Sequence, residues 1–413
     1  MLEYGINKFN LNMINRAQIM RVIWEYGPIS RSDIADKLCM TRAAITVITN
    51  KMIEEGIIIE AGKSATTEKS EISKGRRKVP LDINYNNCLQ IGVYIDKYNI
   101  SIGLATIKGD VLEKYNIEIS QKMYLPEIVE IIERTIKQIL LNSCLKKENV
   151  SGIGIGIMPD MYKYISKEFE CDELYYYIQK IINEKIGIPV FAENALSQLA
   201  IFCWSKDKCD SKHCKSGFLY FDDENVYLNT VLNMPSLFEN INNIIDVNSL
   251  CVNPYGFENH GSVKGSVKSE LTHKAIVRRV RGIYSESKTP ALYKLTGNKM
   301  ERITISQIMT AVSLGDDLLI PLKDELLCEL CLLINNIICI TGVKNIYFYK
   351  FGFNEQQLYE LENHYKKIFG SAICAKLYVC DINDSHRFIC GSFYAVLKGL
   401  FSVSNKDVSS EIS

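Results

Sequence analysis

The basic residues between positions 63 and 78 have the type and spacing of a loop that binds a polyanion. The triplet Arg76-Arg77-Lys78 follows a polar stretch, 62–75, in which basic side chains outnumber acidic ones. Cationic side chains on such a loop neutralise phosphates and add salt-dependent affinity that is independent of base sequence. Residues 1–80 carry 13 Lys and Arg against 9 Asp and Glu, whereas the whole chain has 48 of each. The residues predicted to hold a nucleic-acid backbone or an adjacent minor groove are Lys74, Arg76, Arg77 and Lys78.

Three amphipathic segments precede this loop and would position further polar side chains. Apolar residues recur at three- and four-residue spacing over 11–26, and Gly27-Pro28 ends that helix. A second, short helix starts at Ser30 and a third runs from Thr41 to about residue 55, each with a capping side chain at its start. On the third helix the residues expected to face inward are Ala44, Ile45, Ile48 and Met52, and those expected to face outward are Arg42, Thr46, Thr49 and Asn50.

Two helices, a tight turn and a third helix form the plan of a helix-turn-helix, whose last helix enters the DNA major groove. The next segment fits a wing, because 57–59 and 79–83 have strand patterns on either side of the basic loop. A winged helix that binds only protein is the alternative interpretation. The predicted base-edge contacts are Arg42, Thr46 and Asn50, and the predicted phosphate contacts near helix ends are Ser30, Arg31 and Thr41.

The rest of the chain alternates between strand and helix patterns. Three β-rich runs come first and predict an antiparallel meander, at 89–95, 100–106 and 111–119. Buried strands and helices then alternate, the strands at 150–158 and 188–192 and the helices at 126–141, 171–185 and 193–203. Hairpins followed by βαβ units predict an α/β fold with an actin-like (ribonuclease-H-like) lobe.

The fourteen cysteines could bind metal or form disulfides, but their spacing favours neither. Cys328 and Cys331 lie in an apolar helical run and are expected to be buried thiols. A denser group of metal-ligand residue types matches no common zinc finger or ribbon and is interpreted as a loop cluster. This group is Cys203, Cys209, His213 and Cys214. Without a signal pattern or an apolar span of membrane length, the chain is expected to be cytoplasmic, with reduced thiols and no membrane partner.

Five segments carry a further signal. They are Asn15-Arg16, GPISRSDIADKL (27–38), GRRKVPLDIN (75–84), GIGIGI (152–157) and IPVFAENALSQLA (188–200). These segments resemble the ROK family, whose name stands for repressor, open reading frame and kinase. The resemblance to its repressor branch covers essentially the whole chain and weakens from about residue 206 onward. It implies an N-terminal winged helix followed by a two-lobed, sugar-kinase-type domain that senses a sugar and dimerises.

The positions that match the family's catalytic motifs lack the groups that phosphoryl transfer needs. The first phosphate motif, D-x-G-G-T, corresponds to residues 94–98, with Asp96 and Lys97 in place of glycines. The catalytic E-N-D-A-N segment has Ala195 in place of the proton-abstracting aspartate. The second phosphate loop falls near 220–225, which has three acids and no glycine. The resemblance therefore implies a catalytically inactive domain, a pseudokinase without a cofactor.

The family's zinc site and sugar contacts also fall on altered residues. Ser249 takes the place of the zinc-binding histidine, and the cysteine segment falls on 259–266, which contains no cysteine. A thiolate site cannot be built from these residues, so no metal is expected. The residues that can still hydrogen-bond sugar hydroxyls are the predicted effector-binding residues Glu193, Asn194 and Asp246.

The patterns predict a regulator that binds double-stranded DNA through its winged helix. Together with the resemblance, they imply a transcriptional repressor of carbohydrate-related genes with a possible sugar effector. Such a protein would bind a palindromic operator as a homodimer or dimer of dimers. The predicted domains are a winged helix at 1–84, a first lobe at 85–205 completed by 385–413, and a second lobe at 206–384 for dimerisation and effector binding. Two alternatives stay open. One is a sugar kinase in which Asp96 or another acid replaces the lost catalytic aspartate, and the other is a winged-helix module that binds protein.

Overall fold

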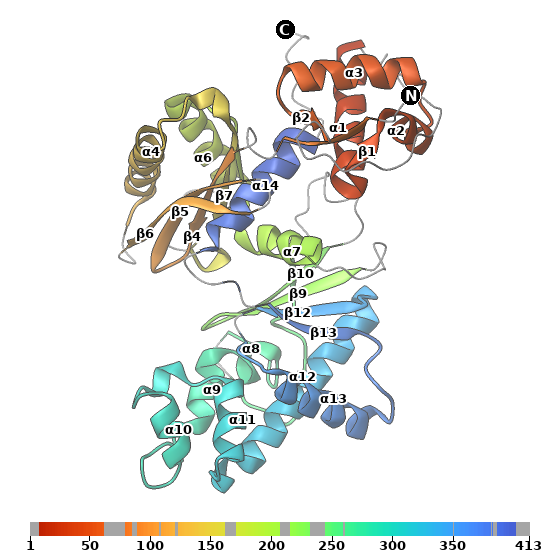
Figure 1. Cartoon of the computed structure of the whole chain (residues 1–413). Coiled ribbons are helices and arrows are strands. Elements are labelled where there is room, and N and C mark those ends of the chain that lie inside the picture. Colours follow the sequence, from red (N-terminus) through yellow and green to blue (C-terminus); the bar gives the residue numbers. More distant parts are fainter. Residues whose placement is uncertain are drawn as a thin grey trace, which may run out of the picture. The chain divides into compact units, whose positions relative to one another are not determined.

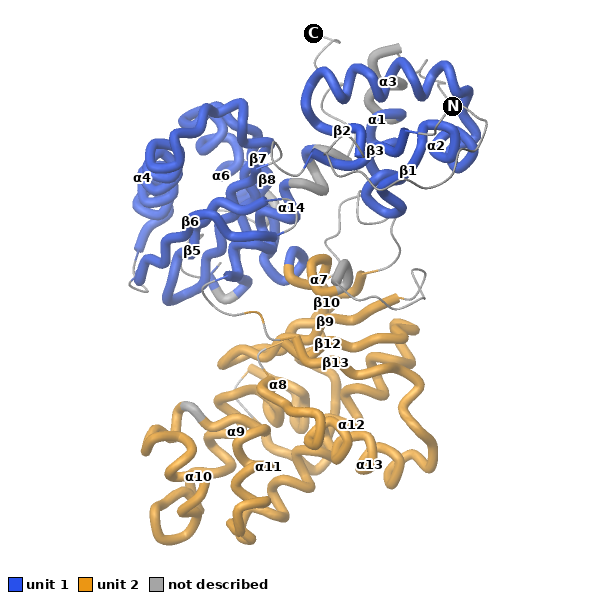
Figure 2. Tube along the Cα trace, in the orientation of Figure 1, with its two compact units in different colours: residues 1–198, 384–413 blue, residues 199–383 orange. Residues whose placement is uncertain are grey.

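The computed structural model describes residues 8–61, 79–84, 89–106, 109–119, 123–161, 171–206, 215–231, 244–258, 261–349, 351–380, 382 and 386–401. The chain divides into two compact units, one formed by residues 1–198 and 384–413 and the other by residues 199–383 (Figure 2). The first unit contains a winged helix and a lobe built on a five-stranded sheet, and the second contains a lobe built on another five-stranded sheet (Figure 1).

The N-terminal part of the first unit folds into three helices and a small antiparallel sheet, which confirms the predicted winged helix. Ser30 and Thr41 cap the second and third helices, since their hydroxyls accept the N–H groups of Asp33 at 3.3 Å and Ala44 at 3.2 Å. The strands pair in the order β1-β3-β2. The elements are α1 (Lys8–Tyr26), β1 (Ile29–Ser30), α2 (Arg31–Leu38), α3 (Arg42–Glu54), β2 (Ile58–Glu60) and β3 (Pro80–Ile83).

Aliphatic side chains from all three helices and from the sheet form the core of the winged helix. Burying one such side chain stabilises the fold by about 1.5–3 kcal/mol. This core therefore fixes α3 and leaves the opposite face of that helix in solvent. The core residues with 0 or 1% of their surface exposed include Ile19, Ile23, Ile34, Ile45, Met52, Ile58 and Leu81.

The lobe of the first unit is a mixed sheet with the strand order β6-β5-β4-β7-β8. Strands β4 to β6 form the predicted antiparallel meander, whereas β7 pairs in parallel with β4 and with β8. Helices α4 and α6 bury their apolar sides against the sheet, and α14 packs on β4 and β7. The elements are β4 (Leu89–Ile95), β5 (Asn99–Thr106), β6 (Val111–Glu118), α4 (Leu125–Asn142), β7 (Val150–Ile157), α6 (Cys171–Ile186), β8 (Val190–Asn194) and α14 (Phe388–Phe401).

Helix α14 approaches the sheet so closely that backbone meets backbone. A Cβ atom added at Gly154 would lie 1.8 Å from the carbonyl oxygen of Gly391, and one added at Gly92 would lie 1.8 Å from that of Phe388. No real Cβ atom fits at that distance, so only glycine allows α14 to sit on β4 and β7. Gly154, the middle glycine of the GIGIGI strand, thus serves the packing of α14 in this chain.

The second unit is built on a sheet with the strand order β11-β10-β9-β12-β13, in which β12 runs parallel to β9 and to β13. Its long apolar helix α12 is buried along one side, with Leu326, Leu330 and Ile334 fully covered. The elements are α7 (Ala195–Lys206, which begins in the first unit), β9 (Ser216–Phe221), β10 (Val226–Val231), β11 (Ile244–Asp246), α8 (Val267–Glu270), α9 (His273–Val280), α10 (Pro290–Leu295), α11 (Ile305–Ser313), α12 (Ile320–Thr341), β12 (Asn345–Tyr349), α13 (Glu355–Phe369) and β13 (Lys376–Cys380).

The cysteines depart from expectation at one point. Cys203, which the sequence analysis placed in a loop cluster, is paired with Cys380 in the second unit. The two residues are 177 positions apart in sequence and meet only through the fold of the second unit. Cys331 is buried on α12, as expected, and burial raises the pKa of its thiol, whereas Cys328 is only partly buried. Of the predicted loop cluster, Cys209, His213 and Cys214 lie outside the described residues.

No helix in the described part of the chain has both the length and the apolar character needed to cross a membrane.

Candidate nucleic-acid interface and effector residues

The side of α3 that faces away from the core carries the predicted base-reading residues. Arg42, Thr46 and Asn50 are all exposed and occupy positions i, i+4 and i+8, which places them along one face of the helix. The Thr46 hydroxyl donates a 2.7 Å hydrogen bond to the carbonyl oxygen of Arg42. Ala43 and Val47 are exposed on the same side and were missed, because the sequence analysis assigned only polar residues to the outward face.

Arg31 lies beneath this face and ties three elements together. Its Nε atom donates to Thr49 Oγ1 at 3.1 Å, and its Nη2 atom lies 3.2 Å from Asn50 Oδ1 and 3.2 Å from Glu60 Oε1. Arg31 therefore links the start of α2 to α3 and to β2. Thr49 is fully buried, so the prediction that it faces outward is wrong. Its hydroxyl tolerates burial because it donates to the Ile45 carbonyl at 2.7 Å and accepts from Arg31.

The remaining predicted phosphate contacts differ in exposure. Ser30 is only 6% exposed, and its hydroxyl both donates to Asp33 Oδ2 at 2.7 Å and accepts the Asp33 N–H group. Thr41 is exposed at the N-terminus of α3, where the helix dipole favours an anion. The four basic residues predicted to contact the DNA backbone lie outside the described residues. They are Lys74, Arg76, Arg77 and Lys78.

An ion pair that the sequence analysis did not predict fastens the end of α3 to α1. Both terminal nitrogens of Arg16 donate to the carboxylate of Glu55, the residue that follows α3. This hydrogen bonding lowers the pKa of Glu55, because it stabilises the ionised carboxylate. The two residues are 39 positions apart, so no local spacing could have indicated the pair.

The predicted effector residues of the first unit lie where β8 ends and α7 begins. Glu193 and Asn194 are both buried. One oxygen of the Glu193 carboxylate accepts the N–H group of Asn194 at 2.9 Å, and the other accepts the hydroxyl of Tyr394 from α14 at 3.3 Å. Asn194 Oδ1 accepts the N–H group of Leu196 at 2.8 Å. Burial, followed by the charge of Glu193, raises the pKa of Tyr394 well above its usual range, so its hydroxyl stays protonated as a donor.

The positions that match catalytic residues have structural roles. Ala195 is fully buried as the first residue of α7 and offers no proton acceptor. Asp96 closes the turn between β4 and β5, since its Oδ1 atom accepts the N–H groups of Tyr98 and Asn99, each at 2.9 Å. Its other oxygen accepts a hydrogen bond from Arg387 at 3.2 Å, and only 9% of the Asp96 side chain is exposed. Asp96, the acid that the kinase alternative would use, is thus held in a buried ion pair with Arg387.

Acidic side chains in the second unit likewise stabilise turns. Asp222 Oδ1 accepts the N–H groups of Glu224 at 2.6 Å and Asn225 at 2.5 Å, which closes the hairpin between β9 and β10. A phosphate-binding loop uses its backbone N–H groups to bind the phosphate, but here the Asp222 carboxylate accepts these two. Asp246, the third predicted effector residue, is exposed at the end of β11 and accepts two hydrogen bonds from Asn248, each at 2.8 Å.

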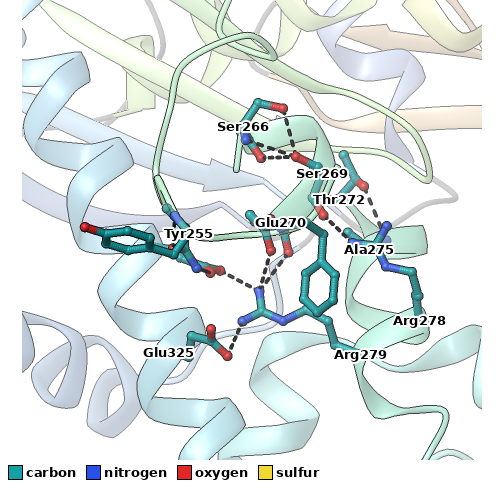
Figure 3. A network of polar contacts seen from close by, with 12 residues as sticks. Tyr255, Ser266, Ser269, Glu270, Thr272, Ala275, Arg278, Arg279 and Glu325 are labelled. Carbon is teal, nitrogen blue, oxygen red and sulfur yellow. Dashed lines mark hydrogen bonds and ion pairs between the residues drawn. The ribbon is translucent and has the colours of Figure 1, made fainter. Parts of the chain in front are cut away.

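A charged network holds the loop before α8, where the resemblance placed the family's zinc site (Figure 3). Arg279 of α9 lies 2.6 Å from Glu329 Oε2, 2.7 Å from Glu325 Oε2 and 3.4 Å from Glu270 Oε2. The other oxygen of Glu270 accepts the N–H group of Phe257 from the loop at 2.5 Å. Among the residues that the structure describes, no group of three His, Cys, Asp or Glu is arranged to hold a metal ion. Ion pairs, rather than thiolates, fasten this loop.

Comparison with known proteins supports the same two-part architecture. The MarR family model matches residues 14–59, from α1 into β2. The xylose repressor of Caldicellulosiruptor bescii is 25% identical over 191 residues, which cover 45% of each chain. The N-acetylglucosamine repressor of Escherichia coli is 29% identical over 32% of this chain and 29% of that protein. The DNA-binding transcriptional repressor Mlc of Escherichia coli is 21% identical over 62% of this chain and 63% of that protein. The chain therefore matches less than two thirds of the length of each of these relatives.

Solved structures extend the similarity to nearly the whole chain. A crystal structure of a ROK family transcriptional regulator, a homolog of the Escherichia coli Mlc protein, superposes with a TM-score of 0.74 at 19% identity over 95% of this chain and 98% of that one. The ROK hexokinase of Thermus thermophilus superposes with a TM-score of 0.54 at 12% identity over 75% of this chain and 98% of that one. The winged helix, the sugar-kinase-like fold and the resemblance to ROK proteins are thereby confirmed.

Proposed function

We propose that this chain, which joins a MarR-type winged helix to the fold of ROK proteins, is a DNA-binding transcriptional repressor of carbohydrate-related genes. The observation that carries the proposal is the outward face of α3, which presents Arg42, Thr46 and Asn50 on a helix that a buried core holds in place. Such a helix fits the major groove, where side chains distinguish base pairs by their edges. The names of the relatives, two sugar-specific repressors among them, support the carbohydrate part.

Each part of the chain takes one role in this proposal. Residues 1–84 bind the operator, residues 85–205 with 385–413 form the first lobe, and residues 206–384 form the second lobe, which dimerises and takes part in effector binding. The protein acts in the cytoplasm as a homodimer or dimer of dimers, and its two-fold symmetry matches a palindromic operator. Arg42 reads base edges, while Thr41 and the basic residues of the wing contact phosphates.

The kinase-like domain carries no catalytic role in this proposal. Ala195 cannot take a proton from a sugar hydroxyl, and Asp96 is already engaged by two backbone N–H groups and Arg387. A general base must reach its substrate within hydrogen-bond distance, which a carboxylate held in this way does not do. The test is ADP release by the purified full chain with ATP, Mg²⁺ and a panel of pentoses, hexoses and amino sugars. Turnover that disappears in Asp96→Asn would restore the kinase reading.

Helix α14 is the element that would carry an effector signal to the DNA-binding domain. Its residue Tyr394 donates to Glu193, one of the predicted effector residues, and the neighbouring Phe393 packs against Trp24 of α1 with 5.9 Å between ring centroids. A sugar hydroxyl that competed for the Glu193 carboxylate would therefore disturb a helix that touches the winged helix directly. The effector acts by shifting the orientation of the two DNA-binding domains.

The decisive experiment is a binding-site selection with the purified full chain and a random duplex library, repeated with candidate sugars. We expect a palindromic sequence to be enriched at moderate salt, and one class of sugar to change its affinity. Failure to retain any duplex sequence, with the protein shown to be folded, would refute the proposal. In that case a winged helix that binds protein would be the better interpretation.

A further inference from the structure

The recognition helix carries an apolar pair in the middle of its polar face. Val47 of α3 has 71% of its side chain exposed, and Ala43, one turn earlier, is also exposed. The buried apolar residues of the same helix, Ile45 and Met52, are each 0% exposed and lie in the core. Neither Val47 nor Ala43 is therefore needed to hold the helix on the domain.

Position along the helix groups this pair with the residues predicted to read bases. Ala43 and Val47 are related by i, i+4, and Asn50 follows Val47 at i+3, so the three share one stripe. Thr46 lies beside them. Its hydroxyl hydrogen is already donated to the Arg42 carbonyl, so it is not available to a base, and the methyl group of Thr46 remains. The centre of the face thus offers methyl groups, and its ends offer the polar groups of Arg42 and Asn50.

Only one base of ordinary DNA presents an apolar group of this size in the major groove. Thymine carries a C5-methyl group there, and small apolar side chains and the threonine methyl pack against it. We propose that Val47, flanked by Ala43 and Thr46, reads the methyl group of a thymine in each operator half-site. This inference rests on the proposed function and specifies the base at the centre of the recognition face, while Arg42 and Asn50 read its neighbours.

The test removes the methyl group from the DNA instead of from the protein. Each thymine of the selected duplex is replaced in turn by deoxyuridine, which keeps every hydrogen-bonding group and loses only the C5-methyl, and the Kd of the full chain is measured at fixed salt. We expect one thymine in each half-site at which this replacement raises the Kd about four-fold, the effect of exposing one buried apolar carbon group. Replacing both half-sites together should multiply the two effects.

Protein variants assign the effect to one side chain. Val47→Ala should bind thymine and deoxyuridine duplexes equally at that position. Val47→Ile, which keeps a branched apolar side chain, should keep the preference for thymine. Leu112→Ala is the matched control, because Leu112 is another exposed aliphatic residue, with 56% of its side chain exposed on β6 of the first lobe. This variant should keep the full difference between the two bases.

The outcomes separate the two levels of the proposal. If no duplex is selected at all, the proposed function fails and this inference fails with it. If a duplex is selected and bound tightly, but no thymine-to-deoxyuridine replacement changes the Kd, the proposed function stands and the reading of a methyl group is refuted. A methyl effect that persists unchanged in Val47→Ala would also refute it, since another side chain would then read that base.

Discussion

The buried network around Arg279 should make the stability of the second unit depend on pH below and near neutrality. Glu270 and Glu329 are 0 and 2% exposed, and both carboxylates share the Arg279 guanidinium, while Glu325 completes the set from a half-exposed position. Burial disfavours the ionised form of Glu270, and the charges of Arg279 and Arg278 only partly oppose it, so this carboxyl group is driven toward its neutral form. Burial raises the pKa of Glu270 to about 7 from an ordinary value of 4.5.

The direction and size of the effect follow from this pKa. The folded protein holds a proton on Glu270 that the unfolded chain would release above pH 4.5. The free energy of unfolding should therefore be highest below pH 4.5, fall as the pH rises toward 7, and level off above it. A difference of 2.5 pKa units corresponds to at most about 3.5 kcal/mol, at about 1.4 kcal/mol per unit. Glu270→Gln imitates the protonated form at every pH and should remove most of this slope.

The assay is chemical or thermal unfolding of the full chain and of the variant at several pH values between 5 and 8. We expect the wild-type protein to lose stability relative to Glu270→Gln across this range, with most of the loss between pH 5 and 7. Glu325→Gln is the control, because its half-exposed carboxylate contacts the same guanidinium. Parallel pH dependence in the wild-type protein and Glu270→Gln would refute the assignment of the proton to Glu270.

Three further changes test other parts of the structure. Arg42→Ala should weaken binding to the selected operator about 5–100-fold and weaken binding to random duplex far less, as measured by titration at fixed salt; equal loss on both would make Arg42 a phosphate contact. Arg31→Met should lower the free energy of unfolding of the winged helix by about 1–3 kcal/mol, because three hydrogen bonds from Arg31 are lost; unchanged denaturation would show that these bonds contribute nothing. Gly154→Ala should destabilise the first unit by about 3 kcal/mol or more. Gly152→Ala on the same strand should cost far less, because its added Cβ would meet its nearest atom at 3.3 Å. Equal unfolding midpoints of the two variants would contradict the close approach of α14.

Local signals in the sequence were sufficient for much of the fold. The hydroxyls of Ser30 and Thr41 predicted the starts of α2 and α3, and the turns between β-rich runs predicted the meander β4 to β6. These features depend on residues that are close in sequence. The outward assignment of Thr49 failed because a distant residue, Arg31, supplies the partner that allows a hydroxyl to be buried.

The effector region shows the same limit more strongly. The sequence identified Asp96 and Glu193 as carboxylates of interest, but their partners come from the opposite end of the chain. Arg387 is 291 positions from Asp96 and Tyr394 is 201 positions from Glu193. No periodicity or motif spacing indicates such pairs, because they form only when α14 returns to the first sheet.

Helix α14 contacts both the altered motifs of the first lobe and the winged helix. The glycines Gly154 and Gly391 bring it against the sheet at backbone distance, which leaves little freedom for it to slide. Within that constraint, Phe393 touches Trp24 of α1 and the next residue, Tyr394, touches Glu193. Helix α14 thus contacts both the Glu193 carboxylate and helix α1 of the winged helix. Under the proposed function, a sugar hydroxyl that binds the Glu193 carboxylate would act on the winged helix through two successive residues of α14, Phe393 and Tyr394.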